Sequence, residues 1–142
     1  AEGALAKTID FVQHRSHKGQ PIGAKQVVAH RIARMWGQIE QSRALIYESL
    51  GMADRLIATG DTSLAAETKM LISTSKYTTC EMAIEVAKQC VWLHGGLGIV
   101  EETGISRYLR DAQTLSIADG TPDLHIESVA FLLGMPGSQL TI

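Results

Sequence analysis

The feature that most constrains the fold is the long stretch between Pro21 and Pro122, which contains few residues that end a helix. In its first part, apolar residues recur every three or four positions, as they do on the buried face of a helix. These residues are Val28, Ile32, Met35, Trp36, Ile39, Ile46, Leu50, Ala53 and Ile57. The spacing predicts one long helix with one buried stripe, and Gly60 is placed to end it.

A second stripe with the same spacing follows directly and ends at a glycine-rich segment, residues 95–98. Its members are Leu64, Thr68, Leu71, Ile72, Ser75, Thr79, Met82, Ala83, Val86 and Cys90. Asp61 or Thr62 can cap the start of this helix, because both side chains accept hydrogen bonds from free backbone N–H groups. The sequence therefore predicts two long antiparallel helices.

Shorter helices are expected on either side of this pair. One covers residues 4–16, and two more cover 106–118 and 122–134, with Thr121 as N-cap and Pro122 at the first helical position. No segment sustains the alternation of apolar and polar residues that a strand requires, so we expect no sheet. The sequence predicts an all-α fold, an antiparallel four-helix-type bundle with an additional short helix and an apolar face left for a partner.

Composition excludes several classes of function. The 142 residues carry a net charge of -2, so no basic excess would attract nucleic acid. No apolar run reaches the length of a membrane span, and no secretory leader opens the chain. Cys80 and Cys90 are expected to be buried, reduced thiols in a cytosol-like compartment. We expect a cytoplasmic protein, or one of the mitochondrial matrix or peroxisome in a eukaryote.

The chain begins with Ala1 and enters a helical pattern at once, without a convincing N-cap. Residues 1–142 are therefore expected to form a single helical domain that belongs to a longer chain.

Three motifs could carry chemistry, although each also has a simple structural explanation. In "HRSHKGQP", Arg15 can hold two phosphate oxygens, or it can be a cation at a helix C-terminus. The histidines at 14 and 17 do not form a convincing metal site, and we assign no metal. In "WLHGGLGI", glycines permit a close backbone approach to a ligand or simply end a helix. Asp119 can be a turn residue or a catalytic carboxylate.

The order of the motifs is more specific than any one of them. The chain carries Arg-x-x-x-Gly-x-Pro with a Gln five residues later, then a long helical hairpin, then Gly-Gly-x-Gly, and then "RYLRDAQTLSIADGT". In this order, the motifs resemble the C-terminal helical domain of the FAD-dependent acyl-CoA dehydrogenases. The resemblance runs from Ala4 to about Leu133. It implies that an N-terminal helical domain and a middle β-domain are absent from this chain.

The resemblance implies the α,β-dehydrogenation of an acyl-CoA thioester, with a carboxylate removing the α-proton while a hydride passes to FAD. Asp119 falls where many family members carry the catalytic Glu, and it is shorter by one methylene. The base is then Asp119 itself, or a residue that lies before residue 1, or it has been lost as in the non-catalytic subunits of heteromeric relatives. We favour Asp119, because an acid is kept in a segment that Gly or Ala could easily fill.

The resemblance also implies the residues that bind FAD. Arg15 matches the family's pyrophosphate contact, Gln26 a contact to the adenosine part, Gly95 and Gly96 a glycine pair near the cofactor, and Thr121 a Thr beside the flavin. Two positions depart from the family pattern. Lys18 replaces an aromatic residue and could add a charge near the phosphates, and Trp92 replaces a Gln and could stack on the adenine.

The partners implied are an acyl-CoA substrate, an electron acceptor for the reduced flavin, and further copies of the chain in a dimer or tetramer. The isolated domain is expected to be inactive. The alternative is a non-catalytic helical module that oligomerises and helps to shape the active site of a partner subunit.

Overall fold

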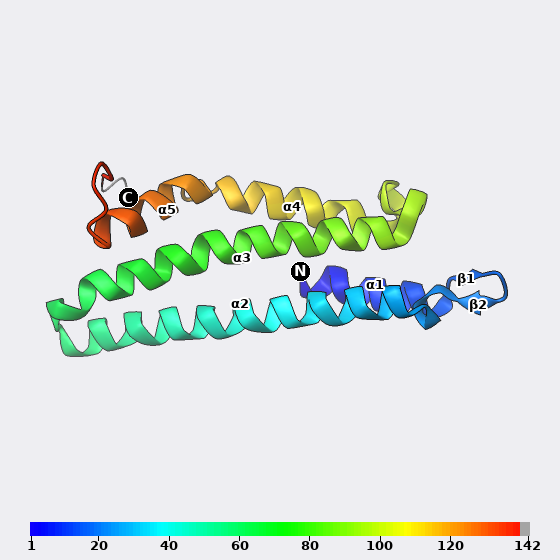
Figure 1. Cartoon of the computed structure of the whole chain (residues 1–142), viewed down its shortest axis with the longest axis horizontal. Helices are drawn as coiled ribbons and strands as arrows, with labels where there is room; N and C mark the ends of the chain where they lie inside the picture. Colours follow the sequence, from blue (N-terminus) through cyan, green and yellow to red (C-terminus); the bar gives the residue numbers. More distant parts are fainter. Residues whose placement is uncertain (140–142) are drawn as a thin grey trace. The chain divides into compact units, whose positions relative to one another are not determined.

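The computed structural model describes residues 1–139, and helices carry most of them (Figure 1). The α-helices in that range are α1 (Glu2–His14), α2 (Gln26–Thr59), α3 (Ala65–His94), α4 (Ile105–Ile117) and α5 (Pro122–Leu132). Short 3₁₀ turns lie between them, namely η1 (Ile22–Ala24), η2 (Thr62–Leu64), η3 (Gly95–Gly98) and η4 (Glu101–Thr103). The prediction of an all-α fold is confirmed.

The helices divide into two compact units. The first comprises residues 1–40 and 82–115, and the second comprises residues 41–81 and the chain from 116 onward. Each of the long helices α2 and α3 contributes to both units. The start of α2 and the end of α3 belong to the same unit, so the two helices run in opposite directions there.

The core of the first unit joins four helices. Its buried members are Ala4, Leu5, Met35, Ile39, Val86, Cys90, Val91 and Ile105, which come from α1, α2, α3 and α4. At its centre the thiol of Cys90 lies 3.9 Å from the sulfur of Met35. The buried hydroxyl of Thr8 donates to the Ala4 carbonyl at 2.7 Å, so this polar group is satisfied inside the apolar cluster. This core holds the first turn of α1 beside the last turns of α3.

The buried stripe of α2 was predicted correctly only in part. Val28, Met35 and Ile39 are buried as expected, whereas Trp36 and the later members Ile46, Leu50 and Ile57 are exposed. The buried positions of α2 are Val28, Met35, Ile39, Ser42, Ser49 and Met52. Four of these recur every seven residues, a period shorter than two helical turns, so the buried side rotates along the helix. A sequence count based on apolar residues overlooks the small serines that continue this seam.

A two-stranded hairpin corrects the expectation of no sheet. β1 (Ser16–His17) and β2 (Gln20–Pro21) pair antiparallel after α1, with His17 opposite Gln20. Lys18 and Gly19 form the connection, with φ of 53° and 80°. Two successive positive φ angles are typical of the tight turn that matches strand twist. Four strand residues are too few to show alternation, which is why the pattern gave no signal.

Both predicted stop signals at the α2–α3 connection are present. Gly60 has φ of 64° and its N–H donates to Leu56 O at 2.9 Å, so it ends α2. Asp61 then caps η2, because its carboxylate accepts from the Ser63 N–H at 3.0 Å. Hydrogen bonds from the Ser63 side chain and backbone lower the pKa of Asp61.

Candidate functional site

Four of the residues predicted to bind a cofactor line one hollow in the first unit, which we call the cationic hollow. They are Arg15, Trp92, Gly95 and Gly96. The hollow has a volume of about 670 Å³ and is completed by Phe11, Ser16, His17, Ile22, Lys25, Leu93, His94, Leu97 and Val100. Segments that are distant in sequence therefore meet there: the end of α1 and the hairpin on one side, and the end of α3 with η3 on the other.

Local backbone chemistry places each side of the cationic hollow. Arg15 ends α1, since its N–H donates to Phe11 O at 2.8 Å and its own backbone is already extended. Gly95 has φ of 58°, which lets the chain leave α3 abruptly. Gly98 is buried, and a Cβ there would lie 2.3 Å from the carbonyl oxygen of Val91. The tight turn at η3 therefore requires glycine at position 98 for space.

His94 links the two sides. Its Nδ1 lies 2.8 Å from Cys90 O, and because a carbonyl only accepts, Nδ1 carries the hydrogen. The ring is buried and stacks on Phe11 of α1, with centroids 4.2 Å apart and planes 22° from parallel. His94 also lines a second, adjoining hollow together with Arg15. The imidazole is thus held in place at the negative end of α3.

The charge of the cationic hollow has one sign. Arg15 and Lys25 carry positive charges, and His17 and His94 contribute imidazoles, while no Asp or Glu is among the described residues that line it. Arg15 and Lys25 are both exposed, so they are available to a ligand from solvent. Two cationic side chains without a carboxylate beside them suit a phosphate group.

Sequence reasoning missed Lys25 and His94, which lie directly beside residues that it selected. Lys25 precedes Gln26, and His94 precedes Gly95. Gln26 is exposed as the first residue of α2 and is not among the described residues that line the cationic hollow. The only sequence signal for these two residues was that each adjoins a selected residue. An exposed Lys before a helix is common, so its presence there does not by itself predict a ligand contact.

Trp92 offers an aromatic surface at the edge of the cationic hollow. It is 57% exposed, and the Lys88 ammonium lies 5.4 Å from its ring centroid. Lys88 also pairs with Glu85, and hydrogen bonds from Lys88 and Gln89 lower the pKa of Glu85. An exposed indole beside cationic side chains is suited to a planar ring such as a nucleobase.

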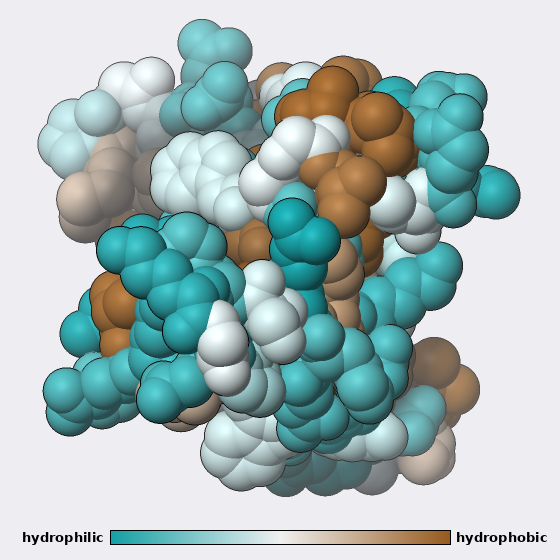
Figure 2. Space-filling view, turned by 90° about the vertical axis from the view of Figure 1, so that its right-hand side faces the viewer, coloured by the Kyte–Doolittle hydropathy of each residue, from teal (hydrophilic) through white to brown (hydrophobic). Residues whose placement is uncertain are grey.

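Figure 2 faces the end of the molecule that carries the hairpin in Figure 1, and hydrophilic side chains cover much of this face. Hydrophobic surface gathers in its upper part. The segment after α3 contributes exposed apolar side chains, namely Leu97, Ile99 and Val100. This end of the first unit thus combines exposed apolar and charged groups, as binding surfaces often do.

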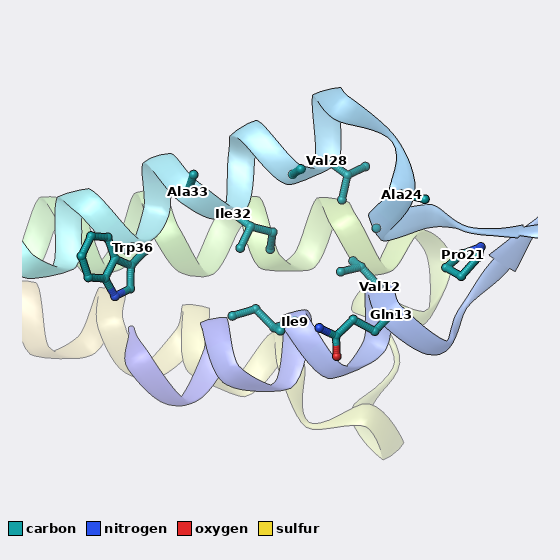
Figure 3. Close-up of a pocket in the computed structure, with 11 residues that line it drawn as sticks. Ile9, Val12, Gln13, Pro21, Ala24, Val28, Ile32, Ala33 and Trp36 are labelled. Carbon is teal, nitrogen blue, oxygen red and sulfur yellow. The ribbon is translucent and has the colours of Figure 1, made fainter.

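A separate hollow of about 540 Å³ lies between α1 and the start of α2 (Figure 3). Ile9 and Val12 of α1 face Ile32 and Trp36 of α2 across it, and Gln13 is one of its few polar residues. None of the residues predicted to bind a cofactor lines it. Its apolar lining does not suit a phosphate group.

Asp119 lies in the second unit, at the corner between α4 and α5. It is exposed and has φ of 59°, and Gly120 follows with φ of 103°. Thr121 occupies the N-cap position of α5 but makes no capping hydrogen bond through its side chain, and Pro122 starts the helix as predicted. The backbone carbonyl of Asp119 accepts from His125 Nε2 at 3.1 Å.

Other groups in the chain are less suited to chemistry. Burial raises the pKa of the Cys90 thiol, which keeps it protonated. His14 contacts Asp10 on the same exposed helix face, and residues 1–139 contain no cluster of three or more His, Cys, Asp or Glu side chains that could hold a metal. Within that range, no helix is long and apolar enough to cross a membrane.

Comparison with known proteins assigns this arrangement to a family. Residues 1–133 match the family described as "Acyl-CoA dehydrogenase, C-terminal domain". The chain is 30% identical over 124 residues to a probable acyl-CoA dehydrogenase, YngJ of Bacillus subtilis, covering 87% of this chain and 30% of that protein. It is 33% identical over 129 residues to the L-prolyl-[peptidyl-carrier protein] dehydrogenase of Pseudomonas fluorescens, covering 91% and 32%.

A solved structure titled "FAD complex of PigA" has the same fold, with a TM-score of 0.81 and 28% identity. The match covers 94% of this chain and 33% of that one. The chain therefore spans about a third of the length of the relatives that it matches.

Proposed function

The chain belongs to the acyl-CoA dehydrogenase family, and from this premise we propose that it is the C-terminal helical domain of a longer flavoprotein that dehydrogenates an acyl-CoA thioester. An N-terminal helical domain and a middle β-domain would supply the rest of the active site. The observation that carries the proposal is the cationic hollow. It brings together Arg15, Gly95 and Gly96, which match cofactor-binding residues of the family, with Trp92, which stands where the family has a Gln.

The residues of the cationic hollow fit the diphosphate and adenosine parts of FAD. Arg15 and Lys25 would contact the phosphates, and Gly95 and Gly96, which carry no side chain, would let the backbone approach the same part of the cofactor. Trp92 would stack on the adenine through the part of its ring that Lys88 leaves free. The absence of a carboxylate among the described lining residues supports an anionic ligand. In the family's arrangement this ligand belongs to a neighbouring subunit, so we also propose a homo-oligomer.

Asp119 is proposed as the base that removes the α-proton. An α-proton of a thioester is weakly acidic, so the carboxylate must lie within hydrogen-bond reach of it in the bound substrate. When bound, FAD would accept the β-hydrogen as hydride, and an external electron acceptor would reoxidise it. Thr121, two residues after Asp119, is proposed to lie beside the flavin. The exposed position of Asp119 in this chain leaves its carboxylate available to a substrate.

The test of the base uses the full-length protein that contains this domain. Asp119→Asn should bind FAD with unchanged affinity but lose flavin reduction by acyl-CoA, followed by stopped-flow absorbance under anaerobic conditions. Normal reduction by this variant would place the base elsewhere. If, in addition, the chain raised the activity of a separate catalytic subunit regardless of residue 119, the non-catalytic alternative would hold.

The test of the cofactor contacts is the FAD dissociation constant. Removing a charge-assisted hydrogen bond costs about 1.5–3 kcal/mol, so Arg15→Ala should weaken FAD binding about tenfold or more. A smaller loss is expected for Lys25→Ala. Arg107→Ala is the matched control, because Arg107 pairs with Asp111 at 3.4 Å on an exposed helix face and does not line the hollow. Equal effects of Arg15→Ala and Arg107→Ala would contradict the assignment.

A further inference from the structure

The corner that carries Asp119 has an unusual backbone. Asp119 and Gly120 are successive residues with positive φ, at 59° and 103°. Side chains with a Cβ rarely adopt such angles, and Asp tolerates them better than most residues. A corner of this kind persists only where neighbouring groups hold it.

His125 contacts this corner. It lies on the first turns of α5, is 6% exposed, and places Nε2 3.1 Å from the carbonyl oxygen of Asp119. Because a carbonyl only accepts, Nε2 carries a hydrogen and donates it. The other ring nitrogen, Nδ1, is buried without a hydrogen-bond partner among the described residues.

The fit between ring and corner is close at Gly120. A Cβ added at this residue would lie 3.2 Å from His125 Nε2, so the imidazole packs directly against the backbone. The same nitrogen therefore lies beside Gly120 and donates to the Asp119 carbonyl. The ring restrains the peptide that follows Asp119 through packing and through a hydrogen bond.

We propose that His125 is a positioning residue for Asp119: its Nε2–H holds the Asp119 carbonyl and thereby sets the direction in which the carboxylate leaves the backbone. This inference rests on the proposed role of Asp119 as base. The Asp side chain has one rotatable bond fewer than Glu, so the position of its carboxylate depends more directly on the backbone. A misplacement of about 1 Å in an active site can lower a rate about a hundredfold.

The experiment compares three replacements of His125 in the full-length holoprotein. His125→Gln keeps a donor at a position similar to Nε2, His125→Asn keeps a donor that is too short to reach Asp119 O, and His125→Leu removes it. Ser128→Ala is the control, because Ser128 is buried on the same helix and its hydroxyl donates to Leu124 O at 3.1 Å, away from the corner. Flavin reduction at saturating acyl-CoA is measured with protonated and α-deuterated substrate.

The expected result is a loss of about tenfold or more in the reduction rate for His125→Leu and His125→Asn. His125→Gln should remain within about threefold of the wild type. FAD affinity and substrate affinity should not change, and the α-deuterium isotope effect should increase in the slow variants, because proton removal becomes more rate-limiting. If the Leu variant does not fold, the Asn variant still provides the comparison with His125→Gln.

Two outcomes would overturn the proposal. One is a reduction rate in His125→Asn equal to that in His125→Gln. The other is a loss in Ser128→Ala as large as that in the His125 variants, which would indicate a general effect of α5 stability. A failure of the base assignment would give a different result, because acyl-CoA would then reduce the flavin of Asp119→Asn at the normal rate.

Discussion

Replacing the glycines of η3 one at a time by alanine should destabilise the protein by amounts set by the space and the backbone angle at each position. Gly98→Ala is the severe case. Its Cβ would lie 2.3 Å from Val91 O and 3.0 Å from Val91 C and Cα, and all three are backbone atoms that cannot rotate away. Contacts under 3.0 Å are essentially unknown for real Cβ atoms, so η3 or the end of α3 must shift by at least 0.7 Å.

Overpacking of this kind costs 1–3 kcal/mol and occasionally more, and a rigid backbone obstacle favours the upper value of about 3 kcal/mol. For a chain of this size such a loss lowers the melting temperature by about 10 °C. Thermal unfolding of the 142-residue chain, followed by circular dichroism at 222 nm, measures this change directly.

The neighbouring glycines are the matched controls. Gly95 has φ of 58° with nothing within 4 Å of an added Cβ. Gly95→Ala should therefore lower the free energy of unfolding only by the roughly 1–2 kcal/mol that alanine costs in the left-handed conformation. Gly96 has open space and no positive φ, so Gly96→Ala should stay within about 0.5 kcal/mol of the wild type. If Gly98→Ala melted at the same temperature as Gly96→Ala, the tight approach of η3 to Val91 would be wrong.

Three further predictions concern stability and reactivity. Val86→Ala should lower the free energy of unfolding in urea by about 2 kcal/mol, because Val86 is fully buried, while Val27→Ala at a 62% exposed position should change it by less than about 0.5 kcal/mol. The Cys90 thiol, with its raised pKa, should react with a thiol reagent at pH 8 at least about a hundredfold faster in urea than in the folded chain; equal rates would contradict its burial. Asp61→Ala should lower the melting temperature at neutral pH, where the ionised Asp61 accepts from Ser63. Since the folded pKa of Asp61 lies below its ordinary value of 3.8, this contribution is present above that value, and the difference from the wild type should disappear as the pH falls through the folded pKa.

The helix ends could be predicted from sequence because they depend on local chemistry. Gly60 and Gly95 have positive φ at the ends of α2 and α3, where a residue without a Cβ is favoured. Pro122 starts α5 because its fixed φ suits the first helical position. Each of these signals involves a residue and its immediate neighbours.

The missed features depend on contacts between distant residues. The buried side of α2 passes through Ser42 and Ser49, which a count of apolar residues does not select. Which side of the helix is buried depends on the helices packed against it. Lys25 joins Arg15 in the cationic hollow only because the hairpin turns the chain back on itself. His125 meets the Asp119 carbonyl six positions away because two positive φ angles intervene.

The two tryptophans of the chain give the first unit two separate optical reporters. Trp36 lines the apolar hollow of Figure 3, and Trp92 lines the cationic hollow. Both indoles are more than half exposed, so a molecule that enters either hollow would change the polarity or quenching around one ring. In a Trp36→Phe chain, fluorescence would report on the cationic hollow alone, and in a Trp92→Phe chain on the apolar one. The protein thus carries an intrinsic means of deciding which hollow a given small molecule occupies.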